Sequence, residues 1–265
     1  MTGADEEDPT KRPRSPFPTS AAHLVDPVEE HPLIPAATVV LLRDAPDGAG
    51  LEALMVRRNT KLEFAGGMWV FPGGRIDPGD HVGGVVVDEP EAVLAAAARA
   101  AVREAQEESG LLLDVADLVP FSHWTPPSVT PKRFATWFFA AHAPAGAVTI
   151  DGGEILDHAW MAPLQALRRR NRHEIELAPP TWITLSTLTR HDSAEDALAA
   201  FRAAEPERFA TRFAIAGPDV IAMYEGDAGY ETTDHTLVGG RHRLLMARGG
   251  WRYERDGFPD PLARA

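Results

Sequence analysis

The chain has 265 residues, of which 44% are hydrophobic and 25% are charged, and it carries a formal net charge of −13. This composition is typical of a soluble globular protein, and the negative charge argues against nucleic acid or an anionic membrane as a partner. Because the chain has no cysteine, disulfides and thiolate chemistry are excluded, and a metal ion would need oxygen or imidazole ligands.

Residues 1–30 form a polar, proline-rich stretch without the apolar core of a secretory signal. We therefore expect a solvated acidic tail over these residues. The same observation predicts a cytoplasmic location.

The next segment alternates apolar runs with turn residues. Runs at 36–42 and 51–56 flank the turn cluster DAPDGAG, and this pattern predicts a β-hairpin. A short strand at 68–71 leads into the sequence Pro-Gly-Gly at 72–74. We expect strand pairing to stop there and a loop to begin.

An alanine-rich segment at 90–109 is the clearest helix. Between Leu94 and Ala105 its apolar residues recur at intervals of four, three and four, which places them on one helix face. Gly110 supplies the stop signal.

The remaining pattern predicts further strands, short helices and a second hairpin. Strands are expected at 134–141 and 154–161, helices at 163–171, 181–191 and 193–204, and a hairpin at 241–253. Strands interspersed with helices indicate a mixed α/β sandwich. We expect a main domain over 31–180 and a C-terminal extension over 181–265, made of helices and a hairpin packed on the core.

The last turn of the helix at 90–109 carries a cluster of acids. Glu107 and Glu108 lie three and four residues after Glu104, so the three carboxylates share one side of the helix, and Arg103 can pair with Glu107. Like charges at a helix C-terminus are unfavourable. A hard divalent cation would offset that repulsion because it prefers oxygen ligands; the alternative is a solvated helix face.

Together with the preceding segment FPGGRIDPGD, this cluster resembles the Nudix box: a glycine, five residues, an acid, seven residues, then Arg-Glu-apolar-x-Glu-Glu-x-Gly-apolar. Gly74 begins the motif, and residues 103–111 contain every residue type of its second half. Asp80 stands where the family has glutamate, and 22 residues separate it from Arg103 in place of seven. The chain thus resembles Nudix hydrolases over about 33–180, with an insertion inside the box.

This resemblance implies a Nudix-type α/β/α sandwich with a mixed sheet. It also implies a metal-dependent hydrolase that cuts the diphosphate linkage of a nucleotide-like small molecule. Mg²⁺ or Mn²⁺ would be bound by Glu104, Glu107 and Glu108, with Arg103 orienting these three, and the four residues are the predicted catalytic set. The general base cannot be assigned from the box, and Glu154 is one candidate.

The predicted substrate contacts come from three parts of the chain. Glycines before the helix would let the backbone approach the phosphates, two cations would contact phosphate, and one aromatic residue would face the ligand. These residues are Gly73, Gly74, Arg58, Arg133 and Trp124. For the cations the alternative is an ordinary exposed side chain, and for the aromatic residue it is core packing.

The insertion within the box and the segment HWTPPSVTPKRFATWFF at 123–139 are similar to the coenzyme A diphosphatase branch of the family, which includes a peroxisomal animal enzyme. That similarity implies coenzyme A or acyl-coenzyme A as the substrate. ADP-ribose, NADH or another nucleoside diphosphate derivative is the alternative within the family. A non-catalytic nucleotide-sensing module is a second alternative, although the intact glutamates speak against it. We expect a small-molecule partner and allow for a homodimer.

Overall fold

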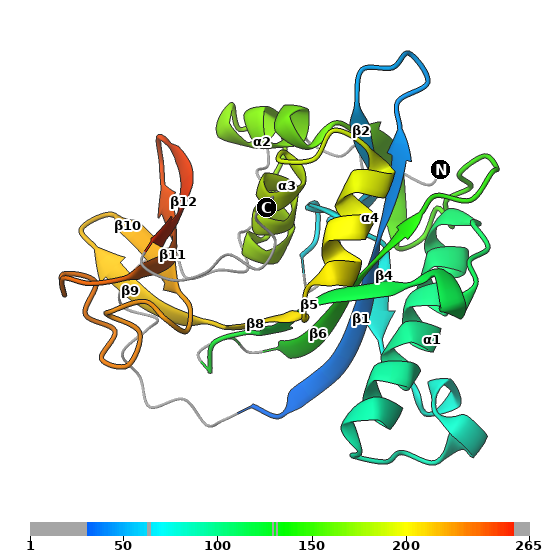
Figure 1. Ribbon diagram of the computed structural model, residues 1–265, viewed down its shortest axis with the longest axis horizontal. Helices are drawn as coiled ribbons and strands as arrows, with labels where there is room; N and C mark the ends of the chain where they lie inside the picture. Colours follow the sequence, from blue (N-terminus) through cyan, green and yellow to red (C-terminus); the bar gives the residue numbers. More distant parts are fainter. Residues whose placement is uncertain (1–30, 63–64, 129, 131, 257–265) are drawn as a thin grey trace, which may run out of the picture.

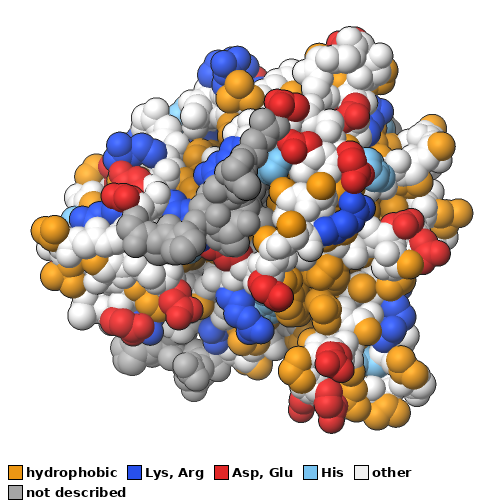
Figure 2. All heavy atoms as spheres, in the orientation of Figure 1, with side chains coloured by type: hydrophobic (Ala, Val, Ile, Leu, Met, Phe, Trp, Pro, Cys, Tyr) orange, Lys and Arg blue, Asp and Glu red, His pale blue; other side chains and the backbone are white. Residues whose placement is uncertain are grey.

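The computed structural model describes residues 31–62, 65–128, 130 and 132–256. The predicted tail over 1–30 lies outside the described residues. Within the described part, no helix is both long and apolar enough to cross a membrane. Acidic and basic side chains are interspersed over the face shown in Figure 2, so the net negative charge is not gathered into one patch on that face.

An eight-stranded mixed sheet lies at the centre of the fold (Figure 1). Its order is β3-β2-β1-β6-β5-β8, with β4 paired to β1 and β7 paired to β2. The strands are β1 (Leu33–Asp44), β2 (Leu51–Arg58), β3 (Trp69–Val70), β4 (Gly73–Arg75), β5 (Val119–Thr125), β6 (Arg133–His142), β7 (Ile155–Met161) and β8 (Glu207–Ala210). The sheet is mixed because β1 runs antiparallel to β2 but parallel to β6.

Strand β1 is buried on both faces and divides the core in two. Its residues Ala37, Val39 and Leu41 belong to one apolar cluster, while Val40 and Leu42 belong to another, because successive side chains of a strand point to opposite faces. The first cluster includes the buried alanines of α1, and the second includes apolar residues of the other helices. The helices are α1 (Pro90–Ser109), α2 (Pro163–Asn171), α3 (Pro179–Leu188) and α4 (Ala194–Ala203). Helix α1 therefore covers one face and the others cover the opposite face (Figure 1), which confirms the α/β/α sandwich.

Several local predictions are confirmed. The runs at 36–42 and 51–56 lie in the antiparallel pair β1 and β2. Helix α1 covers the predicted 90–109, and Gly110 follows it in the left-handed conformation with φ of 70°. A glycine adopts this conformation without the steric penalty of a Cβ.

The expected loop at 72–74 is corrected by the structure. Residues Gly73–Arg75 form β4, which pairs antiparallel with β1 and places Gly73 opposite Thr38. The physical reason is steric. A Cβ atom on Gly73 would lie 2.5 Å from the carbonyl oxygen of Ala37, so glycine is what allows this short strand to lie so close to β1.

The C-terminal residues extend the main sheet and then form a second one. Strand β8 pairs parallel with β5. A four-stranded antiparallel sheet follows, in the order β12-β11-β10-β9. Its strands are β9 (Arg212–Ala216), β10 (Asp219–Met223), β11 (Arg241–Ala247) and β12 (Gly250–Asp256). The last two form the hairpin expected at 241–253.

Candidate active site

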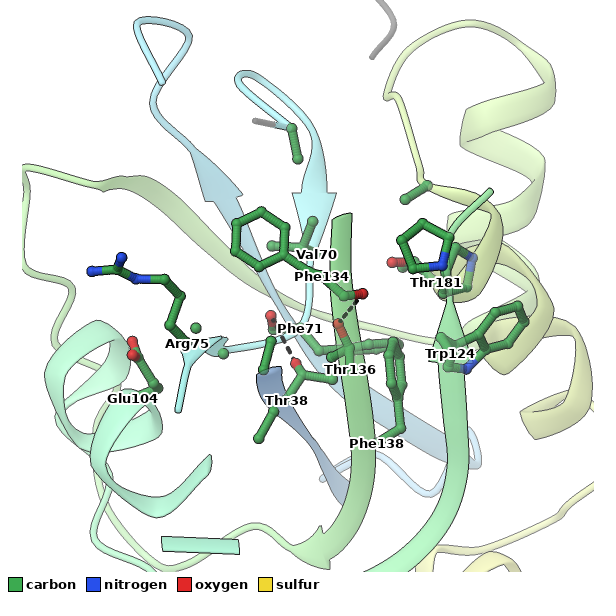
Figure 3. Close-up of a pocket in the computed structure, with 18 of the residues that line it drawn as sticks. Thr38, Val70, Phe71, Arg75, Glu104, Trp124, Phe134, Thr136, Phe138 and Thr181 are labelled. Carbon is green, nitrogen blue, oxygen red and sulfur yellow. Dashed lines mark hydrogen bonds between the residues drawn. The ribbon is translucent and has the colours of Figure 1, made fainter. Parts of the chain in front are cut away.

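A cavity of about 740 Å³ lies where the end of α1 meets β4 and the neighbouring strands. Its volume falls in the upper part of the range of about 300–1,000 Å³ that is typical of small-molecule sites. In Figure 3, Arg75 and Glu104 lie at one end of the cavity and Trp124 and Thr181 lie at the other. The two ends are built from different chemistry.

At the first end, Arg103 is held by acids from two segments. Its guanidinium forms a bidentate pair with Asp80, with Nε–Oδ1 at 3.2 Å and Nη2–Oδ2 at 3.0 Å. Nη1 donates to Glu104 Oε1 at 2.8 Å and to Glu107 Oε2 at 3.2 Å. Nη2 also donates to the carbonyl oxygen of Arg75 at 2.9 Å. The predicted pair of Arg103 with Glu107 is thereby confirmed, and five contacts fix this guanidinium between α1 and β4.

Asp80 reaches Arg103 in spite of the inserted residues that separate the two in sequence. Its side chain is buried, and one oxygen accepts from the backbone amide of Asp77 at 2.8 Å. Burial alone would raise the pKa of Asp80, but the hydrogen bonds from Arg103 and from the amide hold that pKa below its ordinary value. The structure thus assigns Asp80 a positioning contact with Arg103.

Glu108 is the most buried acid of the cluster. Its Oε2 accepts from the backbone amide of Gly73 at 3.0 Å, and its Oε1 lies 3.7 Å from Nη1 of Arg58. Burial raises the pKa of Glu108 to about 8, against the opposing effects of that amide and of Arg58. An acid in this environment is largely neutral near pH 7 unless more positive charge comes close.

Glu104 is packed against the backbone of β4. Burial raises the pKa of Glu104, although Arg103 opposes the rise. A Cβ atom on Gly74 would lie 2.7 Å from Glu104 Oε2 and even nearer to the other carboxylate atoms. Gly74 is therefore needed for Glu104 to approach β4, whereas Gly73 is needed for β4 to approach β1. The expected approach of both glycines to a phosphate stays a prediction.

The carboxylates of Glu104, Glu107 and Glu108 do not converge on a common point in this structure. Among the described residues, no group of three acidic or histidine side chains is arranged to hold a metal ion, because Arg103 bridges Glu104 and Glu107 while Glu108 binds the amide of Gly73. The donor chemistry nevertheless fits a hard divalent cation, which prefers carboxylate oxygens. Six acidic and four basic side chains are found among the described residues that line the cavity. An anionic phosphate would therefore be repelled unless a cation were added.

The structure brings most of the predicted site residues together. Those that line the cavity are Arg58, Gly73, Gly74, Arg103, Glu104, Glu107, Glu108 and Trp124. Arg133 is not brought to the cavity wall. Its guanidinium donates to the carbonyl oxygens of His31 at 2.9 Å and Pro126 at 3.5 Å, and so joins the segment before β1 to the segment after β5.

Arg75 is a cavity residue that the sequence analysis missed. Its side chain is exposed at the carboxylate end, as Figure 3 shows. In the part of the chain that the structure describes, no acid pairs with Arg75. By contrast, Arg58 contacts Glu108 and Glu154, and Arg103 contacts Asp80 and two acids of α1. Its position directly after Gly73 and Gly74 is the sequence feature that could have marked Arg75 as a site residue.

Two further groups of lining residues were not predicted as substrate contacts. Asp151 accepts hydrogen bonds from the amides of Gly153, Glu154 and Ile155 and so shapes the loop that carries Glu154 to the cavity. Thr211 and Phe213 reach the wall from the C-terminal part of the chain, and no motif in the sequence marks them.

Comparison with known proteins identifies the family of this fold. The family model described as NUDIX domain matches residues 32–181. The solved structure of a NUDIX hydrolase from Alicyclobacillus acidocaldarius is 25% identical to the chain, with a TM-score of 0.56 over 64% of this chain and 97% of that protein.

Two other solved structures are more remote. A MutT NUDIX hydrolase from Burkholderia pseudomallei is 19% identical, with a TM-score of 0.43 over 59% of this chain and 98% of that protein. The NUDIX domain of Shewanella oneidensis NrtR, solved in complex with ADP ribose, is 17% identical, with a TM-score of 0.42 over 60% of this chain and 88% of that domain. No curated protein is a significant match.

Proposed function

The chain belongs to the Nudix family and is a Nudix hydrolase, and on this premise we propose that it cuts the diphosphate linkage of a nucleotide-like small molecule at the carboxylate end of the cavity. The observation that carries the proposal is the position of Glu104, Glu107 and Glu108. All three line one wall of a cavity that is large enough for such a ligand. In this proposal residues 31–180 form the hydrolase domain, and residues 181–265 form an extension packed on it.

Glu104, Glu107 and Glu108 are the residues that would hold Mg²⁺ or Mn²⁺. When bound, such an ion neutralises phosphate charge and lowers the pKa of an attacking water. Arg103 keeps Glu104 and Glu107 in place through one shared nitrogen. The amide of Gly73 fixes the carboxylate of Glu108.

The substrate phosphates need cationic contacts from the protein at the same end. Arg58 is close to two acids, so much of its charge is already balanced. Arg75 has no such acid within the described residues and is the better candidate to contact a phosphate directly. Glu154 also lines the cavity, which keeps it as a candidate general base.

The similarity of the inserted box and of residues 123–139 to the coenzyme A diphosphatase branch supports coenzyme A or acyl-coenzyme A as the substrate. ADP-ribose, NADH and other nucleoside diphosphate derivatives are the alternatives, because one fold and one motif serve many diphosphates. A cytoplasmic location, the lack of a nucleic-acid partner and a homodimer stay predictions.

A substrate panel tests the proposal. Coenzyme A, acyl-coenzyme A, ADP-ribose, NADH, dinucleoside polyphosphates and nucleoside triphosphates would each be incubated with the full-length protein and Mg²⁺ or Mn²⁺. We expect cleavage at the diphosphate of at least one compound, with coenzyme A or its acyl esters preferred. Tight binding of a panel member without turnover under either ion would instead support a nucleotide-sensing module.

A further inference from the structure

The end of the cavity away from Glu104 is apolar. Four aromatic residues line the cavity: Trp124, Phe134, Phe138 and Phe213. Figure 3 shows Trp124 and Phe138 on the side away from Arg75 and Glu104, and Phe134 between the two ends. The indole nitrogen of Trp124 donates to Ser122 Oγ at 3.0 Å. The ring is otherwise packed in the core, with 4% of the residue exposed, so it offers the cavity a small area of carbon surface and no free donor.

Three of the hydroxyl groups that line the cavity are already engaged as donors. Thr38 donates to the carbonyl oxygen of Pro72 at 2.5 Å, and Thr136 donates to that of Phe134 at 3.2 Å. The Thr130 hydroxyl likewise donates to a backbone carbonyl. With their protons engaged, these three hydroxyls have no donor left for a carbonyl or anionic ligand group, which would lose hydration without an equivalent hydrogen bond from them; an apolar group has no such loss.

Part of this wall comes from outside the region that the family model matches. The match ends at residue 181, whereas Thr211 and Phe213 follow it by about 30 residues and still line the cavity. The C-terminal part of the chain thus contributes directly to the same cavity as the carboxylates of α1.

This C-terminal contribution is fixed to the main sheet. The amide of Thr211 donates to the carbonyl oxygen of Thr125 at 2.9 Å. Trp124, one residue before Thr125, and Phe209, two residues before Thr211, are partners in the pairing of β8 with β5, and their rings stack with centroids 3.9 Å apart and an interplanar angle of 4°. Backbone hydrogen bonds and ring stacking therefore hold the segment that carries Thr211 and Phe213 against β5.

We propose that the wall formed by Trp124, Thr211 and Phe213 binds an uncharged, largely apolar group that the substrate carries on one side of its diphosphate, and that this wall selects among diphosphates. The inference rests on the hydrolase function proposed above and assigns a role to residues 207–216. The flat face of a nucleobase and an alkyl chain both present an uncharged, apolar surface, so either group could bind this wall. The experiment distinguishes between the two.

The test uses the full-length protein and two sets of ADP esters. In the first set, the alkyl group on the terminal phosphate of ADP grows from methyl to octyl. In the second set, the methyl ester is compared with the same compound lacking the adenine base. The variants are Phe213→Ala and Phe213→Leu. Phe201→Leu is the matched control, because Phe201 is buried in the same core cluster but does not line the cavity.

We expect wild-type kcat/KM to be at least about 10-fold higher for the larger member of one set, since a hydrophobic pocket discriminates by this order for small apolar groups. Phe213→Ala should remove most of that gain through a higher KM and leave the smaller member of that set near its wild-type rate. Phe213→Leu keeps most of the core volume and should give an intermediate loss, which preserves the test if the alanine variant does not fold. The set that shows the gain identifies the group that the wall binds.

Equal rates along both sets would overturn the inference while leaving the hydrolase function in place. An equal loss for the larger and smaller substrates in the Phe213 variants, or the same loss in Phe201→Leu, would also overturn it. A wild-type protein that hydrolyses a member of the substrate panel but none of the esters would overturn the inference alone. A protein that hydrolyses neither the esters nor any panel member, with Mg²⁺ or Mn²⁺ present, would overturn the hydrolase function itself.

Discussion

The two ends of the cavity are built in different ways. The carboxylate end depends on short segments, β4 and the last turn of α1, whose residues contact each other through Arg103 and Glu108. The apolar end combines β5, β6, the start of α3 and residues near β9, which are distant in sequence. The catalytic residues can thus be encoded in a compact sequence motif. The residues that would determine substrate specificity are brought together only by the tertiary fold.

The largest effect is expected at the carboxylate end. Replacing Glu107 or Glu108 with glutamine keeps the size of the side chain but removes the charge that would hold the cation. Loss of one preorganised electrostatic contact typically lowers kcat by about 10²–10³-fold, and a lost metal ligand should lower it at least as much. The measurement is kcat on the preferred compound of the substrate panel.

The control for this pair is Glu91→Gln, which alters an exposed acid in the first turn of the same helix. It should leave kcat unchanged. Without metal, the melting temperature of the Glu107 variant should stay level or rise slightly, because the change relieves like-charge repulsion at the helix end. That of the Glu108 variant should stay level, because burial already keeps this acid largely neutral near pH 7. Near wild-type activity in both variants would mean that these carboxylates do not hold the catalytic cation.

A smaller effect, on binding rather than turnover, is expected for Arg75. A hydrogen bond to a charged group contributes about 1.5–3 kcal/mol, so Arg75→Ala should raise KM by about 10-fold or more, and Arg75→Lys should recover part of the loss. Steady-state kinetics would measure both variants. Arg252→Ala removes the same charge from an exposed residue of β12 and is the control. An unchanged KM in Arg75→Ala would remove Arg75 from the phosphate site.

The smallest catalytic effect is expected for Asp80, which acts only through Arg103. In Asp80→Asn, the contacts of Arg103 with Glu104 and Glu107 remain, so we expect kcat to fall less than in the Glu107 and Glu108 variants. Unfolding should become easier because a buried charged pair loses one partner. Asp117→Asn, at an exposed position, is the control.

The pH dependence of stability sharpens the Asp80 prediction. The folded-state pKa of Asp80 lies below its ordinary value of 3.8, so its contribution to the free energy of unfolding is fully present above that value and is lost as the pH falls through the folded-state pKa. Urea unfolding of wild type and Asp80→Asn should therefore differ most near neutral pH and converge in acid. A difference that grows in acid would contradict the assignment of this contact.

Local patterns explain what could be predicted from the sequence. The period of α1, the glycine after it and the turn between β1 and β2 are signals carried within short segments. Helix α2 coincides with the predicted 163–171. The residue types in the second half of the box were likewise sufficient to place the three carboxylates on one side of the helix.

Contacts between distant segments explain what could not be predicted. Strand β5 contains Pro120 and a register shift between Pro120 and Ser122, which obscure its alternation, and β8, β9 and β10 have only four or five residues each. Arg133 has the sequence context of an exposed cation. Its actual partners depend on the parallel pairing of β1 with β6 across about 100 residues.

The proposed activity depends on the carboxylates at the end of α1 holding a divalent cation for diphosphate hydrolysis. The most direct measurement is the hydrolysis rate of the preferred substrate after the metal is removed with a chelator and then restored. We predict that activity vanishes in chelator and returns with excess Mg²⁺ or Mn²⁺ in the wild type, but not in Glu108→Gln. Full turnover in metal-free buffer would contradict the account.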